Sequence, residues 1–238
     1  LKKKKKNLIQ KKFIKDNLIQ QKFKMSSEKN KIQIFRPFGP SVAKVIMSEE
    51  IIKLLNDYVD KIVDDKKKSK ELDYGDQLAG NVIQEFKLEE EFMKTSGWAK
   101  FLANSTSKWL ENTEKRKITK FHIINSWIVR QFQNDYNPLH VHGGHISGVG
   151  YLKLPSDFGE YTQKTKVNNL NGNLSLVNGT RLFNSPATYN IKPKVGEFYL
   201  FPNYLMHVVY PFTNSNEERR SISFNALIND EIYNVYGR

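Results

Sequence analysis

The sequence predicts a mainly β protein of the sandwich or jelly-roll kind, with α-helices confined to its N-terminal half. From residue 118 onward, short stretches of alternating apolar and polar residues are separated by glycine, proline and asparagine. Before residue 118, two longer stretches have the spacing of amphipathic helices instead. We therefore expect one domain over 25–238, in which a helical support at 47–117 buttresses one sheet of a β core at 118–228.

Residues 1–24 form a lysine-rich, low-complexity tail that accounts for most of the positive charge. Its ten lysines and one aspartate give +9 of the total of +13, so the rest of the chain carries 13 − 9 = +4. We expect a disordered extension, or translated sequence upstream of a start at Met25, and a basic amphipathic arm is the alternative. Because the charge lies in a tail and not in a patch on the domain, nucleic acid is not an expected partner.

The composition narrows the protein class further. The chain of 238 residues contains no cysteine, which excludes disulfides and thiolate metal ligands. No apolar run approaches the roughly 20 residues that a membrane-spanning helix requires, and the N-terminus does not have the pattern of a secretory signal. We expect a soluble, cytoplasmic protein without a membrane partner.

The N-terminal elements follow from short patterns. Ile32–Phe35 alternates as an early strand and ends before Pro37. Ser48 can cap a helix whose apolar positions recur at helical spacing up to Val63. The lysine-rich stretch 66–70 should end this helix and be solvated. A second helical region covers 89–111, and Gly97 within it makes two shorter helices possible.

The C-terminal half is predicted to consist of short strands. Residues 122–131 alternate as a strand does. Further strand candidates share apolar or alternating character between turn residues: Ile146–Leu154, Asn173–Val177, Arg181–Phe183, Thr188–Ile191, Glu197–Phe201, His207–Tyr210 and Arg220–Ile228.

Histidines indicate a metal site in this half. His140 and His142 are two residues apart, so on a strand they face the same side, and Gly143-Gly144 after them leaves backbone slack. His207 follows an apolar strand and a Pro202-Asn203 turn. Imidazole suits ferrous iron, and three protein ligands leave coordination positions open. The alternative is that the histidines do not share a site and each fills a separate polar role. Four of the five histidines fall in these two motifs, which favours the metal site.

Two further histidines are assigned differently. His145 is a candidate ligand, a partner that orients a ligand, or a substrate contact. His122 lies on an earlier strand without companions, and we interpret it as structural.

An arginine pair follows the third histidine. Only one of Arg219 and Arg220 can face inward on a strand, and Ser221 and Ser223 share the side of Arg219. A guanidinium beside hydroxyl groups suits a carboxylate pocket. A surface charge cluster with Glu217 and Glu218 is the alternative. Both interpretations hold if Arg219 points inward and Arg220 is solvated.

The segments Tyr136–His142, Ser147–Pro155, Lys194–Pro202, His207–Pro211 and Arg219–Asn225 resemble the 2-oxoglutarate- and Fe(II)-dependent oxygenases. The likeness is to the group called "putative 2OG-Fe(II) oxygenase" in bacteria and marine phages, and it spans roughly residues 118–228. It implies a double-stranded β-helix fold with Fe(II) as cofactor and 2-oxoglutarate as cosubstrate.

The resemblance also implies roles for single residues. His140 would be the first metal ligand and His207 the distal one, while Arg219 and Ser221 would hold the distal carboxylate of 2-oxoglutarate, with Tyr151 as a further pocket candidate. The family pattern is His-x-Asp/Glu, whereas this chain has His142 at the second position. A His-x-His arrangement occurs in the narrower group, and His145 or an unplaced acid are the alternatives. No catalytic residue beyond the metal ligands is predicted.

The implied reaction is hydroxylation of a C–H bond by dioxygen, with succinate and carbon dioxide as co-products. The primary substrate is not predicted. The competing hypotheses are a cupin-type three-histidine iron dioxygenase that needs no keto acid, and a non-catalytic β-helix binding module.

Overall fold

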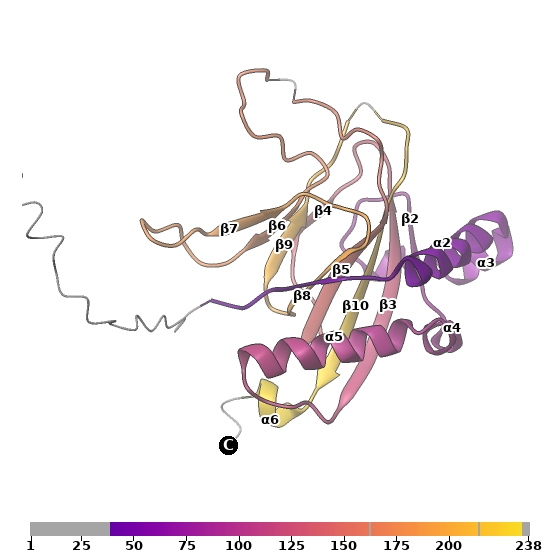
Figure 1. Cartoon of the computed structure of the whole chain (residues 1–238). Coiled ribbons are helices and arrows are strands. Elements are labelled where there is room, and N and C mark those ends of the chain that lie inside the picture. The colour runs from indigo at the N-terminus through magenta and orange to yellow at the C-terminus, as the bar shows by residue number, and fades with distance from the viewer. Residues whose placement is uncertain (1–38, 162, 214, 235–238) are drawn as a thin grey trace, which may run out of the picture. The chain divides into compact units, whose positions relative to one another are not determined.

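The computed structural model describes residues 39–161, 163–213 and 215–234, which form a mainly β fold with two antiparallel sheets (Figure 1). The predicted tail at 1–24 and the predicted strand Ile32–Phe35 lie outside the described residues. Two facing sheets with N-terminal helices against one of them confirm the predicted double-stranded β-helix, or jelly-roll, class.

The larger sheet has six strands in the order β1-β8-β5-β10-β3-β2, and the smaller sheet has four in the order β4-β9-β6-β7. The strands of the larger sheet are β1 (Ala43–Ile46), β2 (Gln84–Lys87), β3 (Phe121–Gln131), β5 (Ile146–Lys153), β8 (Glu197–Pro202) and β10 (Arg219–Ile228). Those of the smaller sheet are β4 (Asn137–His140), β6 (Leu174–Val177), β7 (Thr188–Ile191) and β9 (Met206–Val209).

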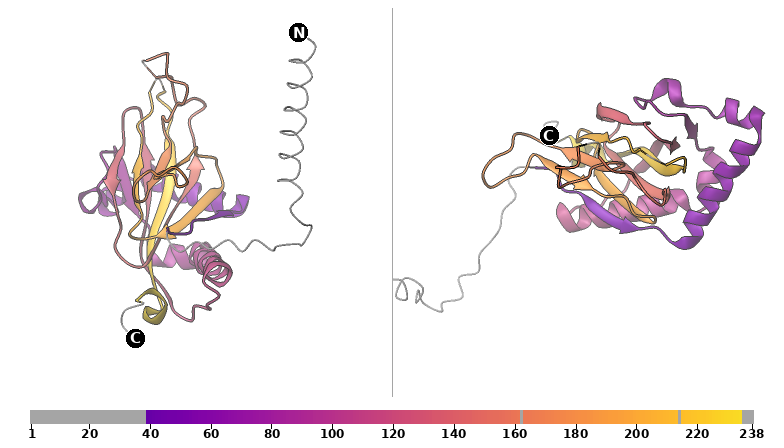
Figure 2. Two further views of the ribbon diagram at one scale, coloured as in Figure 1. Left: turned by 90° about the vertical axis from the view of Figure 1, so that its left-hand side faces the viewer. Right: turned by 90° about the horizontal axis from the view of Figure 1, so that it is seen from above.

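Helices α2 (Glu49–Asp64), α4 (Glu90–Thr95) and α5 (Trp98–Thr113) cover the face of the larger sheet that points away from the smaller one. The remaining helices are α3 (Lys66–Glu71), which has no buried residue, and α6 (Asp230–Tyr233), and a 3-10 turn lies at Gly75–Gln77. Leu55 of α2 and Trp98 of α5 are fully buried in one cluster with Ile128, Ile222 and Phe224 of the sheet. Figures 1 and 2 show α5, in magenta, running along this face. The helices therefore stabilise the sheet by burying its apolar side.

The sequence accounts for both predicted helical regions. Ser48 caps α2 by accepting a hydrogen bond from the backbone N–H of Ile51 at 3.3 Å. Gly97 has φ of 77° and separates α4 from α5, which confirms the predicted break. The lysine-rich stretch is mostly exposed, as expected, but it forms the short helix α3 because Asp65 accepts hydrogen bonds from the N–H groups of Lys67 and Lys68.

The predicted strands from β5 onward are confirmed with shifts of one or two residues at their ends, with one exception. Arg181–Phe183 is not a strand: Leu182 forms only an isolated bridge with Ser185, and Phe183 is fully exposed. Strands β1, β2 and β4 were not among the predicted strands. None of these four-residue segments alternates strictly between apolar and polar residues.

The register of the central strands decides which side chains face the smaller sheet. Ser221 of β10 pairs with Val129 of β3 on one side and with Tyr151 of β5 on the other. Tyr151 belongs to a second buried cluster, between the sheets, with Leu176 of β6 and Val209 of β9. Arg219, Ser221 and Ser223 therefore share the inner side of β10 with this cluster.

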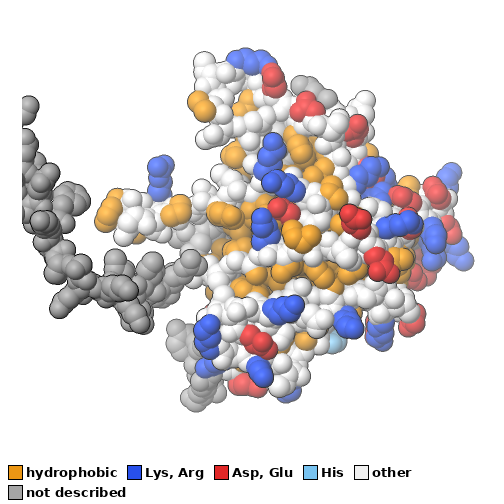
Figure 3. Space-filling model, in the orientation of Figure 1, with side chains coloured by type: hydrophobic (Ala, Val, Ile, Leu, Met, Phe, Trp, Pro, Cys, Tyr) orange, Lys and Arg blue, Asp and Glu red, His pale blue; other side chains and the backbone are white. Residues whose placement is uncertain are grey.

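The surface of the domain carries mixed charge. In Figure 3 lysine and arginine side chains are interspersed with acidic ones on the face that is seen. No helix within the described ranges is both long and apolar enough to cross a membrane.

Candidate metal centre and cosubstrate pocket

The structure brings His140, His142 and His207 together at one end of the space between the sheets. One potential ligand atom from each residue lies within 4.8 Å of the others. His140 of β4 and His207 of β9 are register partners across the smaller sheet. His142 follows β4 and is held by Asn203, whose carbonyl accepts from its N–H at 3.0 Å and whose side chain donates to its carbonyl at 3.1 Å. Two separate motifs thus converge because β4 and β9 are neighbours.

Backbone carbonyls orient two of the three imidazoles. Nδ1 of His140 lies 2.6 Å from the carbonyl oxygen of Pro138, and Nδ1 of His207 lies 2.9 Å from that of Leu205. A carbonyl oxygen only accepts hydrogen bonds, so each Nδ1 carries the proton and each Nε2 keeps its lone pair. Metal-binding histidines are commonly held in this way.

Burial keeps the cluster uncharged. Burial, together with the neighbouring imidazoles, lowers the pKa of His142 to about 3 and that of His207 to about 4. Burial also lowers the pKa of His140, against a hydrogen bond from its ring to Pro138. Neutral imidazole is the form that coordinates a metal, so all three side chains are ready to bind a cation near neutral pH.

The geometry fits a single borderline divalent ion such as ferrous iron. Nε2 of His142 and Nε2 of His207 lie 3.0 Å apart. Two nitrogens each about 2.1 Å from a shared ion are separated by a distance of this order. No carboxylate joins the group within the described part of the chain, so the cluster is a set of three neutral nitrogen ligands.

His145 lies apart from this group. Its ring stacks on Tyr233 with centroids 3.9 Å apart, and its Nδ1 accepts from the N–H of Ile228 at 3.2 Å. Its ring therefore contacts the C-terminal segment and not the three clustered imidazoles. His122 is exposed on β3, also away from the cluster.

Arg219 is a charged residue that is buried without a full set of hydrogen bonds. It is 1% exposed, and its Nη1 donates to Gln131 and, at 3.3 Å, to the hydroxyl of Ser221. Its Nε and Nη2 have no hydrogen-bond partner. Burial lowers the pKa of this guanidinium, and only Tyr151 acts in the opposite direction among the described residues. Burial of a cation with two unused hydrogen-bond donors costs free energy unless an anion binds to it.

The surroundings of Arg219 suit a carboxylate. Its guanidinium lies 5.2 Å from the centre of the Tyr151 ring, whose hydroxyl is buried without a hydrogen-bond partner. Burial raises the pKa of Tyr151 to about 12, against the effect of Arg219, so its hydroxyl keeps a proton to donate. Arg219, Ser221 and Tyr151 therefore place several hydrogen-bond donors close together on the inner face of the larger sheet, an arrangement that suits a carboxylate.

The prediction that Arg220 is solvated is wrong. Arg220 is 2% exposed and points to the helical side, where it pairs with Glu218 at 2.7 Å and with Asp60 of α2 at 2.7 Å. Alternation along β10 placed it correctly on the face opposite Arg219, but the sequence did not show that α2 covers that face. Glu218 also pairs with Arg130 in this buried network. Glu217, which the predicted surface cluster included, is not part of it and accepts a hydrogen bond from the N–H of Ser156.

A cavity of about 310 Å³ adjoins the histidine cluster and includes residues that the sequence did not single out. His140 and His142 line one part of it, and Tyr74, Glu85 and Trp127 line another. Trp127 lies on the inner side of the predicted strand, so its position could have been anticipated. Glu85 could not, because β2 shows no recognisable pattern.

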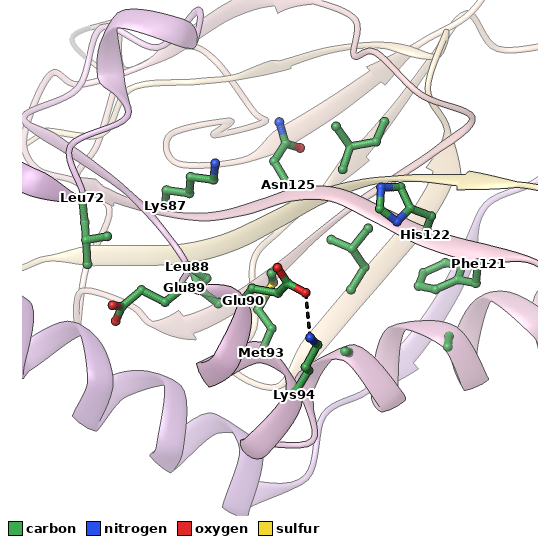
Figure 4. Close-up of a pocket in the computed structure, with 14 residues that line it drawn as sticks. Leu72, Lys87, Leu88, Glu89, Glu90, Met93, Lys94, Phe121, His122 and Asn125 are labelled. Carbon is green, nitrogen blue, oxygen red and sulfur yellow. Dashed lines mark ion pairs between the residues drawn. The ribbon is translucent and has the colours of Figure 1, made fainter.

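A larger hollow of about 790 Å³ lies between β3 and the helices α4 and α5 (Figure 4). Ile124 and Asn125 line both spaces, so the two cavities are neighbours. In Figure 4 Asn125 and Lys87 point away from the helices.

Comparison with known proteins identifies the class. Residues 125–225 match the family model described as "Putative 2OG-Fe(II) oxygenase". These residues contain both histidine motifs, Tyr151 and Arg219. The resemblance stated from the sequence is thus confirmed: this part of the chain is a domain of the 2-oxoglutarate- and Fe(II)-dependent oxygenases, which are oxidoreductases with Fe(II) as cofactor and 2-oxoglutarate as cosubstrate.

Solved structures with a similar fold include several oxygenases. A viral collagen prolyl hydroxylase from Paramecium Bursaria Chlorella virus-1 is 16% identical, with a TM-score of 0.49, over 78% of this chain and 94% of that one. A prolyl-4-hydroxylase from Pseudomonas putida is 11% identical, with a TM-score of 0.48, over 79% and 91%. HygX from Streptomyces hygroscopicus, with nickel, 2-oxoglutarate and hygromycin B bound, is 10% identical, with a TM-score of 0.49, over 79% and 82%. No curated protein matches the chain by sequence.

Proposed function

We propose that this oxygenase hydroxylates a C–H bond of an organic substrate and that His140, His142 and His207 hold its iron. When bound, Fe(II) and 2-oxoglutarate supply the oxidation by dioxygen, with succinate and carbon dioxide as co-products. In this proposal the three histidines act through their Nε2 atoms, two of which are already oriented by backbone carbonyls. A site of three neutral ligands offers less charge compensation to a divalent cation than one containing a carboxylate.

In the same proposal Arg219 holds the distal carboxylate of 2-oxoglutarate with help from Ser221 and Tyr151. The observation that supports this most strongly is the buried guanidinium with two unpartnered nitrogens. Ser223 of β10 pairs with Trp127, whose ring centre lies 5.5 Å from that of His142. Arg219 is four residues from Ser223 on the same side of the strand, and its Nη1 contacts Ser221, so its side chain extends toward the histidines.

Apolar side chains surround the region of Arg219 between the sheets. Tyr151, Tyr199 and Phe201 of the larger sheet are buried against Leu174 and Leu176 of the smaller one. A dry pocket strengthens the attraction between the guanidinium and a carboxylate.

The alternative enzyme, a cupin-type three-histidine dioxygenase without a keto acid, would share the metal ligands but would have no use for Arg219. Binding of 2-oxoglutarate to the iron-loaded full chain, measured by calorimetry without oxygen, separates the two. The Arg219→Met variant should weaken binding by about 100-fold, because two charge-assisted hydrogen bonds are lost. Equal affinity in the variant, or no binding to the wild type, would contradict the proposed cosubstrate pocket.

A further inference from the structure

The cavity beside the histidine cluster has an acidic side that the proposed reaction does not use. Glu85 of β2 lines this cavity together with His140 and His142. It is 2% exposed and pairs in register with Val129 of β3. Its side chain therefore points into the protein although β2 is an edge strand. Burial of a carboxylate costs free energy that an exposed position on the same strand would avoid.

The carboxyl group of Glu85 is incompletely satisfied. Its Oε1 is buried without a hydrogen-bond partner. Burial and, to a smaller extent, nearby Asp73 raise the pKa of Glu85 to about 7, against a hydrogen bond with Asn137 that lowers it. No cation in the described part of the chain contributes to its environment. A ligand with a hydrogen-bond donor or a positive charge would stabilise the ionised form of this carboxyl group.

The rest of the cavity also offers acceptors. Oδ1 of Asn125 is buried and has no partner, while its Nδ2 donates to the hydroxyl of Tyr74 at 3.0 Å. The rings of Tyr74 and Trp127 lie 6.4 Å apart at an angle of 50°. Aromatic faces attract cations, and the ammonium group of Lys87 already lies 5.7 Å from the centre of the Tyr74 ring.

We propose that this cavity is a subsite for the primary substrate and selects substrates that carry a protonated amine, which Glu85 and Asn125 bind beside the rings of Tyr74 and Trp127. His140 and His142 line the same cavity, so an amine held there keeps the neighbouring carbon atoms close to the histidine cluster. The assignment of this ligand as the substrate to be oxidised rests on the proposed function. The binding of an amine does not depend on it.

The neighbouring hollow gives room for a larger molecule. The cavity of about 310 Å³ is at the small end of ligand-binding pockets, and it shares Ile124 and Asn125 with the space of about 790 Å³ beside α4 and α5 (Figure 4). The amine can therefore belong to a side chain or to the end of a longer substrate.

The test uses n-butylammonium as the probe and 1-pentanol as its neutral counterpart of similar size. The full chain is titrated with each, without metal, and binding is followed by NMR through the indole N–H signal of Trp127. We expect butylammonium to bind about tenfold more tightly than pentanol in the wild type. Glu85→Gln keeps the shape of the side chain and removes its charge, and this variant should lose that preference while pentanol affinity stays unchanged. Glu91→Gln, which neutralises an exposed acid on α4, is the matched control and should bind both probes as the wild type does.

The pH dependence gives a second readout that needs no variant. Glu85 must be ionised to bind an ammonium group, so affinity should rise between about pH 6 and about pH 8 in the wild type and stay flat in Glu85→Gln. Among the titratable groups, Asp73 raises the pKa of Glu85, and Tyr74, His140 and His142 line the same cavity. Lys87 lies over the ring of Tyr74 and lines the neighbouring hollow. Burial lowers the pKa of both imidazoles, so these do not become charged in this window.

The outcomes separate this inference from the proposed function. Equal affinities for the two probes in the wild type, or an unchanged preference in a folded Glu85→Gln variant, would overturn the amine subsite. A lost preference in that variant supports the subsite even if the chain fails to bind 2-oxoglutarate. That second failure would contradict only the cosubstrate pocket.

Discussion

Nε2 of His142 and Nε2 of His207 lie 3.0 Å apart although 65 residues separate them in the sequence. Two nitrogen lone pairs at this distance repel each other unless a proton or a metal ion lies between them. His207 directs its Nε2 toward the cluster because its Nδ1 donates to the carbonyl of Leu205. This pair is therefore the central element of the candidate metal centre.

Removal of His207 should abolish iron retention. In His207→Ala, bound iron should fall from about one equivalent to a small fraction of it, because two ligands hold a divalent ion much less well than three. The measurement is iron content after anaerobic loading and desalting, with a thermal melt to show that the fold persists. His122→Ala, which changes an exposed histidine on β3, is the control. Unchanged iron stoichiometry in His207→Ala would refute the ligand assignment.

The two adjacent buried arginines should respond in opposite directions when replaced by methionine. Arg219→Met removes an unpaired buried charge, so the free energy of unfolding of the cofactor-free protein should stay the same or rise. Arg220→Met leaves Glu218 and Asp60 without a partner they share and should destabilise the fold by about 3–5 kcal/mol. Urea unfolding of both variants tests this. Strong destabilisation by Arg219→Met would mean that the arginine is structural.

Glu85 should make the stability of the fold depend on pH. Its pKa is raised from 4.5 to about 7 by burial, so as pH rises through this range the unfolded chain ionises first and folding becomes less favourable. The loss is complete above about pH 7. Glu85→Gln removes this effect and should stabilise the protein at about pH 8 by roughly 1–3 kcal/mol. At about pH 4 the two proteins should have similar stability, since Glu85 is then protonated in both states. Unfolding curves at the two pH values check this, and a difference that does not change with pH would contradict the buried state of Glu85.

The loop after His142 depends on Gly144. Its φ is 81°, and a Cβ there would lie 2.8 Å from Cδ1 of Ile124 and 3.0 Å from the carbonyl oxygen of Ala226. Gly179 has a similar φ of 66° but open space around it. Gly179→Ala should therefore cost about 1 kcal/mol from backbone strain alone. Gly144→Ala should cost clearly more and should weaken iron binding as well, because His142 is two residues away. Similar melting temperatures and iron affinities in the two variants would show that the loop adapts freely.

The sequence predicted the C-terminal half well because its strands alternate and end at turn residues. The side of β10 on which Arg219 lies could be predicted because Ser221 and Ser223 share that side. The closeness of the two histidine motifs could be predicted because imidazoles commonly bind one metal ion together. The roles of His140, His142 and His207 as metal ligands stay predictions, and so do those of Arg219, Ser221 and Tyr151 in binding the cosubstrate. The burial of Arg220 could not be predicted, because alternation shows which face a side chain occupies but not what covers that face.

Other features were missed for different physical reasons. Strand β2 does not alternate between apolar and polar residues, so the sequence did not predict the inward position of Glu85. Arg181–Phe183 has an apolar pair typical of a strand, yet its residues are exposed and have no sheet to pack against. A sequence pattern reports on a single strand or helix. The burial of Glu85 and the exposure of Arg181–Phe183 depend on the elements that pack beside them.

The most direct test of the account is the visible charge-transfer band that forms when 2-oxoglutarate chelates ferrous iron in the absence of oxygen. The full chain should develop this band only when both iron and 2-oxoglutarate are present. Arg219→Met should retain its iron and fail to form the band at the same 2-oxoglutarate concentration. A folded, iron-loaded wild-type protein without the band, or a variant that forms it equally well, would contradict the site described.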